Sequence, residues 1–296
     1  MFYFLPDTPG FLSLDGEGAL DFLQRQTSND LLPLAPGRVI QTVLTSPTGR
    51  ILDVLTVFNR GASLGLITLP GRAPATQRFL RSRIFFMDRV TVSDERANWL
   101  QVDVYDARLL AQLNLPLPQR GEICRAEAGW VLAHGGLLED GFRILAPADG
   151  ALLDRLATMG AGALSPQAHE IRRIERGYPA HRVELAEAYT PLEVGLHALV
   201  AENKGCYTGQ EVLARQINYG KISRHLAGVA LADAVSVGAE VLVDARPVGE
   251  ITSFAVSPRF GPLALAVLRR PHHEPGTQVT VGVLAGRVVA LPAGRE

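Results

Sequence analysis

Hydrophobic periodicity divides the chain into a mixed N-terminal region and an all-β C-terminal region. Up to about residue 224, short apolar runs typical of strands alternate with segments in which apolar residues recur every three or four positions, as in helices. The helical period is then lost, and Gly, Pro and Asp turns separate six strand-like runs: 226–231, 239–244, 247–256, 262–269, 277–283 and 286–291. The pattern predicts an α+β body over 1–224 and a small β-barrel or sandwich over 225–296.

Several predicted helices of the body carry end signals. The helix over 166–176 has Ser165 as its cap, Pro166 at its first position and Gly177 after its last. Asp15 is a candidate N-cap for a helix over 16–26. The other predicted elements are helices over 75–85, 106–113 and 150–159, a helix that opens at Thr190-Pro191, and strands over 2–5, 11–14, 38–45, 50–58 and 63–69.

Residues 88–146 differ in pattern from the rest of the body. Four short strands are predicted there, over 88–93, 99–105, 130–134 and 142–146, around the small helix at 106–113. Proline-containing connectors at 115–118 and 146–147 separate these elements from their neighbours. We therefore expect residues 88–146 to form an inserted α+β unit of their own.

Composition and charge exclude several functional classes. With 47% hydrophobic and 20% charged residues, the 296-residue chain has the composition of a soluble globular protein. A net charge of −1 gives no bulk attraction to nucleic acid or to an anionic membrane, so we expect neither as a direct partner. One arginine cluster surrounds the predicted helix at 75–85 and is either a solvated face or a site for an anionic ligand tail: Arg72, Arg78, Arg81, Arg83 and Arg89.

The cysteines and histidines narrow the chemistry further. Cys124 and Cys206, the two cysteines, provide no disulfide framework, and the N-terminus lacks the basic region of a signal peptide, so we expect a cytoplasmic protein. The seven histidines do not have the spacing of a metal motif, and we expect no metal site. Glycine-rich nucleotide loops and the serine nucleophile elbow are also missing from the sequence.

The stretch over 203–216 carries the strongest chemical signal. Cys206 has Lys204 two residues before it, and Thr208 with Glu211 forms a T-x-x-E pattern that predicts a capping box at the start of a helix. A positive charge and a helix N-terminus both lower the pKa of a thiol, and the thiolate is the reactive form. A buried, inert cysteine in a tight turn is the alternative, and the local sequence leaves both interpretations open.

The same stretch resembles a known family. Residues 204–211, Lys-Gly-Cys-Tyr-Thr-Gly-Gln-Glu, are similar to the K-G-C-Y-x-G-Q-E signature of the YgfZ-type folate-binding proteins, relatives of the aminomethyltransferase (T-protein) of the glycine cleavage system. Residues 22–30, 173–177 and 249–253 resemble further motifs of these families, and the resemblance is weakest at 90–160. The motif assigns Cys206 and Lys204 as the chemical pair, surrounded by Gly205, Tyr207, Gly209, Gln210 and Glu211.

Glu193 lies in a second matching segment. Residues 190–196 resemble the T-P-x-E-x-G-L segment of both families, in which a T-protein glutamate binds the pteridine ring of tetrahydrofolate. A carboxylate suits this task because it accepts two N–H bonds from the amino-pyrimidine edge. Glu193 is also the predicted N3 partner of Thr190 in a capping box, and one oxygen can serve each purpose. Arg224 is a candidate for contact with the folate or another anion, or a surface residue.

Asp53 lies in a third segment of interest. Residues 49–54 resemble a Gly-x-Ile-x-Asp-Asp stretch of the T-protein, where an aspartate assists one-carbon transfer at the folate amine. This chain has Val54 in place of the second aspartate, which argues against transferase chemistry. A hydrogen bond at the end of a strand is the equally weighted alternative for Asp53.

The resemblance implies a fold and a function. The implied fold is a T-protein-like ring of α+β units, with a folate-binding body that includes a ferredoxin-like subdomain, and a C-terminal barrel. The implied function is that of a tetrahydrofolate-binding accessory protein, more than a classical enzyme, for assembly or repair of iron–sulfur clusters. Its partners would be client enzymes, such as radical tRNA-modifying enzymes, or cluster carriers, and Cys206 would be the essential thiol. The alternatives are a folate-dependent aminomethyltransferase or other one-carbon transferase, and an interaction protein with an incidental thiol.

Overall fold

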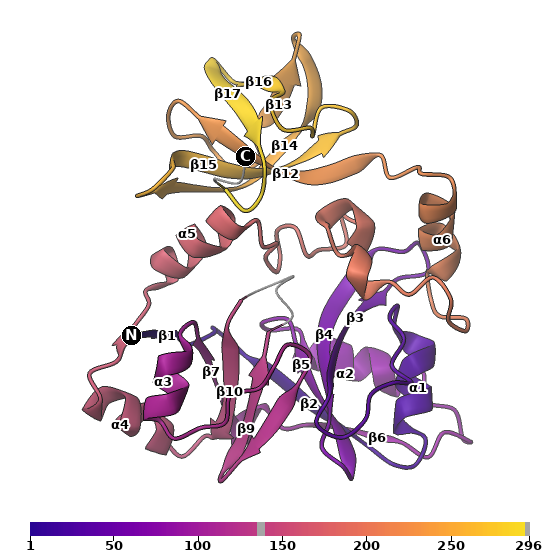
Figure 1. Cartoon of the computed structure of the whole chain (residues 1–296). Coiled ribbons are helices and arrows are strands. Elements are labelled where there is room, and N and C mark those ends of the chain that lie inside the picture. Colours follow the sequence, from indigo (N-terminus) through magenta and orange to yellow (C-terminus); the bar gives the residue numbers. More distant parts are fainter. Residues whose placement is uncertain (135–139, 294–296) are drawn as a thin grey trace. The chain divides into compact units, whose positions relative to one another are not determined.

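The chain forms two compact units in a computed structural model that describes residues 1–134 and 140–293 (Figure 1). Unit 1 comprises residues 1–165 and 198–210, and unit 2 comprises residues 166–197 and 211 onward. These units divide the chain at different points from the body and barrel expected on either side of residue 224. No helix in the described part of the chain is both long and apolar enough to cross a membrane.

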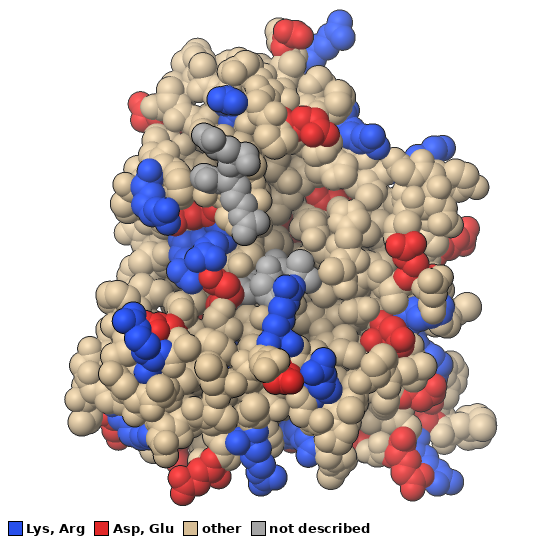
Figure 2. Space-filling model, viewed as in Figure 1, with Lys and Arg blue, Asp and Glu red and all other residues tan. Residues whose placement is uncertain are grey.

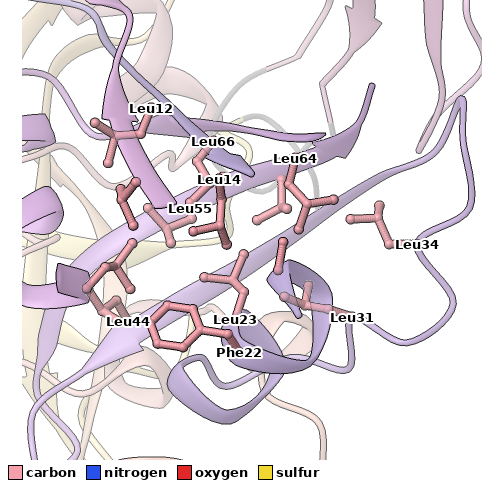
Figure 3. Close-up of a cluster of buried hydrophobic side chains, with 14 of the residues drawn as sticks. Leu12, Leu14, Phe22, Leu23, Leu31, Leu34, Leu44, Leu55, Leu64 and Leu66 are labelled. Atoms are coloured by element: carbon pink, nitrogen blue, oxygen red, sulfur yellow. The ribbon is translucent and has the colours of Figure 1, made fainter. Parts of the chain in front are cut away.

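Unit 1 contains a five-stranded antiparallel sheet covered on one face by two helices. Its strand order is β3 (Val39–Thr45), β4 (Ile51–Asn59), β5 (Ser63–Thr68), β2 (Gly10–Asp15) and β6 (Thr91–Asp94). The helices α1 (Ala19–Gln26) and α2 (Ala73–Arg81) contribute Phe22, Leu23, Ala73 and Leu80 to one buried cluster with leucines of the strands (Figure 3). Alternate strand residues supply this face because the side-chain period of a strand is two.

A second sheet completes unit 1. Its order is β11 (Gly162–Ala163), β1 (Phe2–Phe4), β7 (Trp99–Val104), β10 (Phe142–Pro147), β9 (Gly129–Ala133) and β8 (Ile123–Ala126), and only β1 and β11 are parallel. The short 3-10 helix η1 (Arg96–Asn98) precedes β7. Leucines of α3 (Ala107–Gln112) and α4 (Ala151–Thr158) share a core with one face of this sheet.

Aromatic side chains join the two sheets across their other faces. Phe11 and Phe58 of the first sheet share a cluster with Trp99 and Trp130 of the second, and the two tryptophan rings are 4.9 Å apart between centroids. Arg60 lies over the Phe11 and Trp130 rings, at 5.6 and 5.8 Å from their centroids. Unit 1 is therefore a four-layer arrangement of helices, sheet, sheet and helices around one aromatic interface.

Several expectations for unit 1 are corrected by this arrangement. The strand predicted at 88–93 forms as β6 but pairs with β2 of the first sheet, while β1 and β11 complete the second sheet, so residues 88–146 are not a self-contained insertion. The helix predicted from residue 16 begins at Ala19, and Asp15 is not its N-cap. The carboxylate of Asp15 instead accepts a 2.8 Å hydrogen bond from the Ser13 hydroxyl.

Unit 2 consists of a closed six-stranded barrel with helices before it. The predicted α5 (Pro166–Arg176) is confirmed with the expected bounds and is followed by the short 3-10 helix η2 (Pro191–Val194) and by α6 (Gln210–Asn218), while η3 (His197–Leu199) lies where the chain passes into unit 1. The helix expected to open at Thr190-Pro191 is only the four residues of η2. All six predicted C-terminal strands are present, in the order β12 (Arg224–Leu231), β15 (Gly261–Arg269), β14 (Arg246–Ser257), β13 (Glu240–Val243), β16 (Gln278–Val281) and β17 (Leu284–Val289).

A buried polar network within unit 2 explains two of the motifs noted in the sequence. Glu184 is fully buried, and its carboxylate accepts hydrogen bonds from the Thr252 and Ser253 hydroxyls of β14 at 2.7 and 2.6 Å. Arg173 of α5 donates to the Ser253 hydroxyl at 2.7 Å and lies 3.6 Å from the Glu184 carboxylate. The arginine of residues 173–177 and the Thr-Ser pair of residues 249–253 therefore connect α5 to the barrel.

We expect Glu184→Ala to destabilise unit 2 by about 2–4 kcal/mol, because the buried Ser253 hydroxyl loses its acceptor and Arg173 keeps, among the described residues, only Glu170 as a carboxylate partner. Urea denaturation measures this loss. Glu187→Ala, at an exposed position three residues away, is the matched control and should change stability by less than about 0.5 kcal/mol. Equal effects of the two substitutions would contradict the role of the network.

Candidate functional site

The segment that carries Cys206 packs within unit 1 against the end of α1 and the start of β3. The Ser28 hydroxyl donates a 2.6 Å hydrogen bond to the Leu199 carbonyl, and the Ala201 amide donates to the Ser28 carbonyl at 3.0 Å. Cys206 is exposed, whereas the neighbouring Tyr207 is only 8% exposed. Cys206 is therefore not the buried cysteine of the alternative interpretation.

Lys204 fastens this segment to the chain at the end of α1. Its ammonium donates to three backbone carbonyls, those of Gln24, Thr27 and Asn29, each at 2.7 Å. An ammonium has three donors, so these three short bonds match its full capacity. The carbonyl of Gln24 lies in the last turn of α1, where a helix leaves acceptors unpaired and favours a positive charge.

The surroundings of Lys204 differ from those of a free surface lysine. Its nitrogen lies 5.3 Å from the centroid of the Tyr207 ring, which covers it. Burial lowers the pKa of Lys204 to about 8, and burial likewise raises the pKa of Tyr207 to about 12. At pH 7 Lys204 is therefore still protonated and able to donate three bonds. The contacts give it a positioning role beside the chemical role that the motif assigned.

The glycines of the motif have separate uses. Gly209 adopts a φ of +84°, and a side chain there would lie 2.5 Å from the Ser46 carbonyl oxygen, so the β3–β4 turn excludes any larger residue. A side chain at Gly205 would meet nothing within 4 Å. The Gly205 backbone is thus open to an approaching molecule beside the exposed thiol.

The predicted capping box of Thr208 and Glu211 is wrong. Helix α6 begins at Gln210, and the left-handed Gly209 separates it from Thr208. The carbonyl of Thr208 accepts a hydrogen bond from the Thr45 hydroxyl of β3. Gln210 braces the motif with weak 3.4 Å contacts, one from the Tyr207 amide and one to the Lys204 carbonyl, and Glu211 is exposed.

Glu193 and Arg224 form a bidentate ion pair in unit 2. The Arg224 Nε and Nη2 atoms lie 2.8 and 3.1 Å from the two carboxylate oxygens of Glu193. The Glu193 side chain is 4% exposed, and the Arg224 side chain is 32% exposed. Glu193 also accepts a 2.9 Å bond from the Thr190 amide, so the predicted capping role at this amide is confirmed.

Sequence reasoning missed two residues that extend this ion pair. The Arg224 guanidinium lies 5.1 Å from the centroid of the Tyr189 ring, and the Tyr189 hydroxyl donates to Glu250 at 2.9 Å. Burial and the Glu250 carboxylate raise the pKa of Tyr189 well above its ordinary value. Glu250 belongs to the matched segment at 249–253, which was the available signal. The Tyr189 ring thus packs against the Arg224 guanidinium of the ion pair.

Asp53 is fully buried on β4 in unit 1. Its Oδ1 atom accepts hydrogen bonds from the Val54 and Leu69 amides at 2.8 and 2.9 Å, and Oδ2 bonds to the Thr76 hydroxyl of α2. Burial raises the pKa of Asp53 to about 7, although these hydrogen bonds oppose the rise. The contacts are those of the hydrogen-bonding alternative, and Thr76 is a partner that the sequence did not reveal.

The predicted site residues are therefore distributed over both units. Cys206, Lys204 and Asp53 lie in unit 1, and Glu193 and Arg224 lie in unit 2. Among the described residues, no group of three His, Cys, Asp or Glu side chains is arranged to hold a metal ion. On the face shown in Figure 2, basic and acidic side chains are interspersed and do not separate by sign.

The sequence of the chain is similar to several known proteins. Residues 224–293 match the family described as Glycine cleavage T-protein C-terminal barrel domain. A chloroplastic protein of Arabidopsis thaliana named as a candidate transferase is 28% identical, covering 96% of this chain and 69% of that protein. An aminomethyltransferase of Moorella thermoacetica is 29% identical, covering 97% of this chain and 84% of the enzyme. The chain is thus similar along most of its length to proteins of the glycine cleavage T-protein/aminomethyltransferase superfamily.

The fold of the chain is also that of a solved aminomethyltransferase. The crystal structure of aminomethyltransferase T from Bartonella henselae superposes with a TM-score of 0.88 and 22% identity, covering 98% of this chain and 85% of the enzyme. The predicted T-protein-like α+β fold with a C-terminal barrel is thereby confirmed. In this chain Val54 lies where the similar T-protein stretch has its second aspartate, and Asp53 is enclosed by its own chain.

We expect Asp53→Asn to remove a pH dependence of stability. Because the pKa of Asp53 rises from 3.8 to about 7 on folding, the folded protein keeps a proton that the unfolded chain releases between pH 4 and 7. The free energy of unfolding therefore falls as the pH rises through this window, by up to about 4 kcal/mol at about 1.4 kcal/mol per pH unit. Asparagine can make the same bonds, since its oxygen accepts from both amides and its nitrogen donates to Thr76.

Urea denaturation at pH 4.5, 6 and 8 measures this effect. The Asn variant should match the wild type at the lowest pH and exceed it at pH 8, whereas Asp7→Asn, at an exposed position, should follow the wild type throughout. If Asp53→Asn and the wild type show the same pH dependence, Asp53 is ionised in the folded protein.

Proposed function

We propose that this chain is a tetrahydrofolate-binding accessory protein that supports assembly or repair of iron–sulfur clusters, with Cys206 as its essential thiol. The observation that carries the proposal is the exposure of Cys206 on a segment that Lys204 fixes by three carbonyl bonds. Similarity to the T-protein superfamily supports the folate component, and the K-G-C-Y-x-G-Q-E motif supports the thiol component.

The chemistry of the Glu193 and Arg224 pair fits a folate ligand. The Arg224 fork presents two parallel N–H donors to the Glu193 carboxylate. The amino-pyrimidine edge of a pteridine carries the same guanidine-like pair of donors. Glu193 would therefore hold that edge in place of the guanidinium, and the displaced Arg224 would be able to pair with a carboxylate of the folate tail. Bound tetrahydrofolate or its one-carbon derivative would supply a reduced pteridine, as cofactor or sensor.

The thiol is suited to transient contact with a cluster that belongs to a partner. An exposed cysteine thiolate is a good ligand for iron and a nucleophile toward sulfur. Cys124, the other cysteine, is half-buried in β8, and two cysteines cannot supply the four thiolates of a stable cluster. The cluster is thus cargo, shared with a client enzyme or a cluster carrier during transfer. Such a role agrees with a cytoplasmic location, which stays a prediction.

A folate-dependent aminomethyltransferase is the alternative. Its support is the full-length similarity to proteins that carry this name. Transfer of a one-carbon unit requires an acidic group beside the folate amine, however, and here Asp53 is fully buried with Val54 beside it. The alternative also gives Cys206 no task. We therefore favour the accessory protein over the transferase.

We expect Glu193→Gln to weaken tetrahydrofolate binding at least tenfold, because one ligand N–H then faces an amide NH₂ group. Calorimetry on the wild type, Glu193→Gln, Cys206→Ser and the exposed control Glu187→Gln measures the difference. Cys206→Ser and Glu187→Gln should keep the wild-type affinity. If the wild type binds no reduced folate, the proposed cofactor is wrong. If Glu193→Gln binds as tightly as the wild type, the pteridine does not contact this carboxylate.

We expect Cys206→Ser to abolish the support of iron–sulfur enzymes in cells, because serine is a far weaker metal ligand and nucleophile. The measurement is the activity of a tRNA-methylthiolating enzyme in cells that lack the native protein and produce each variant. Cys124→Ser is the matched control and should restore full activity. Full activity with Cys206→Ser would reject the thiol function without affecting the folate claim.

A further inference from the structure

The loop between α2 and β6 exposes three consecutive apolar side chains. Phe85, Phe86 and Met87, here called the apolar tip, are 68%, 97% and 77% exposed. Single exposed apolar residues are common on soluble proteins, but contiguous groups of large ones mark interaction sites. The apolar tip has no part in the folate or thiol chemistry proposed above.

The apolar tip is held in one shape by hydrogen bonds at its base. The Asp88 carboxylate accepts a 3.0 Å bond from the Phe85 amide, and the Asp88 amide donates to the Phe85 carbonyl at 2.9 Å. Arg25 of α1 donates to the other Asp88 oxygen at 2.6 Å. A contact loop that is ordered before binding loses less conformational entropy on association. Phe85 and Phe86 thus lie on a turn that is closed by hydrogen bonds between Phe85 and Asp88.

Positive charge surrounds the apolar tip. Five arginines lie on α1, on α2 and in the loop, whereas the acidic residues there are Glu17, paired with Arg89, and Asp21 and Asp88, paired with Arg25. In the described part of the chain, no carboxylate pairs with the remaining arginines, Arg78, Arg81 and Arg83. Arg81 donates to the Val92 carbonyl at 2.7 Å, and the Arg83 guanidinium lies 5.0 Å from the Phe79 ring centroid, so both side chains have contacts within the chain other than carboxylates.

We propose that the apolar tip docks into an apolar pocket rimmed by carboxylates on a partner protein. Phe, Met and Arg are the residue types enriched at protein interfaces, and a fully exposed aromatic ring at a fixed turn is a suitable anchor. The excess of arginine requires a complementary acidic rim. Glu17 and Asp21 each pair with one arginine and interrupt the positive charge, so separate carboxylates on a protein match it better than the continuous negative charge of an anionic lipid surface.

The test begins by replacing Phe86 with a photoreactive benzoylphenylalanine in the full-length chain in cells. The same group at Val283, which is also 97% exposed but lies in the β16–β17 hairpin of unit 2, is the matched control. We expect one protein adduct specific to position 86. The cross-linked peptide, identified by mass spectrometry, should come from a surface with apolar residues among Asp and Glu. Arg78→Glu with Arg83→Glu should abolish the adduct.

The affinity of the purified partner is then measured against exposed-site variants. Phe86→Ser with Met87→Ser should weaken binding at least tenfold, Val283→Ser should not change it, and raising salt from 50 to 300 mM should weaken the wild type. All three positions are exposed, so unchanged melting temperatures verify folding. Adducts identical to those of the control, adducts only with lipid or with a second copy of this chain, or insensitivity to the charge reversal would each overturn the proposal.

Discussion

The ammonium of Lys204 is the interaction on which the candidate thiol site depends. Three carbonyls from the end of α1 and the residues after it receive its three donors at 2.7 Å. This arrangement satisfies acceptors that a helix end otherwise leaves to water, and it fixes a segment that contributes little regular structure of its own. The exposed Cys206 lies two residues after Lys204 on the same segment, so these bonds fix its position as well. Lys204, which the motif assigned to the chemistry of Cys206, thus also holds the segment that carries the cysteine in position.

Two carboxylates of similar sequence interest have opposite environments. Asp53 is enclosed between β4 and α2, where burial raises its pKa to about 7. Its carboxylate oxygens accept hydrogen bonds from groups of the same unit. Glu193 is nearly as buried but meets the guanidinium of Arg224, so its charge is matched by a group that has the donor pattern of a pteridine edge. The difference places the folate proposal at Glu193 and not at Asp53.

Local signals in the sequence predicted the elements better than their assembly. The six barrel strands and α5 follow from alternation, Pro166 and Gly177, because these features act within one element. The pairing of β6 with β2, and of β1 with β7 and β11, depends on contacts between distant residues that no local pattern records. The capping box predicted at Thr208 did not form, because Gly209 adopts a left-handed backbone conformation and α6 begins only at Gln210.

The site residues show the same division. The motif singled out Cys206, and the structure shows that this cysteine is exposed. The carbonyl partners of Lys204 lie about 175–180 positions away in the sequence, so the positioning role could not be predicted. Arg224 was a candidate for anion contact, but its bidentate bond to Glu193 required the two segments to meet within unit 2.

One measurement tests the central claim, that Lys204 makes Cys206 functional by fixing its segment. It is the activity of an iron–sulfur client enzyme in cells that produce Lys204→Met, in which the cysteine is intact but the ammonium is gone. The account predicts that this activity falls to the level of cells without the protein, while the purified variant still binds tetrahydrofolate. Full client activity with Lys204→Met would contradict it.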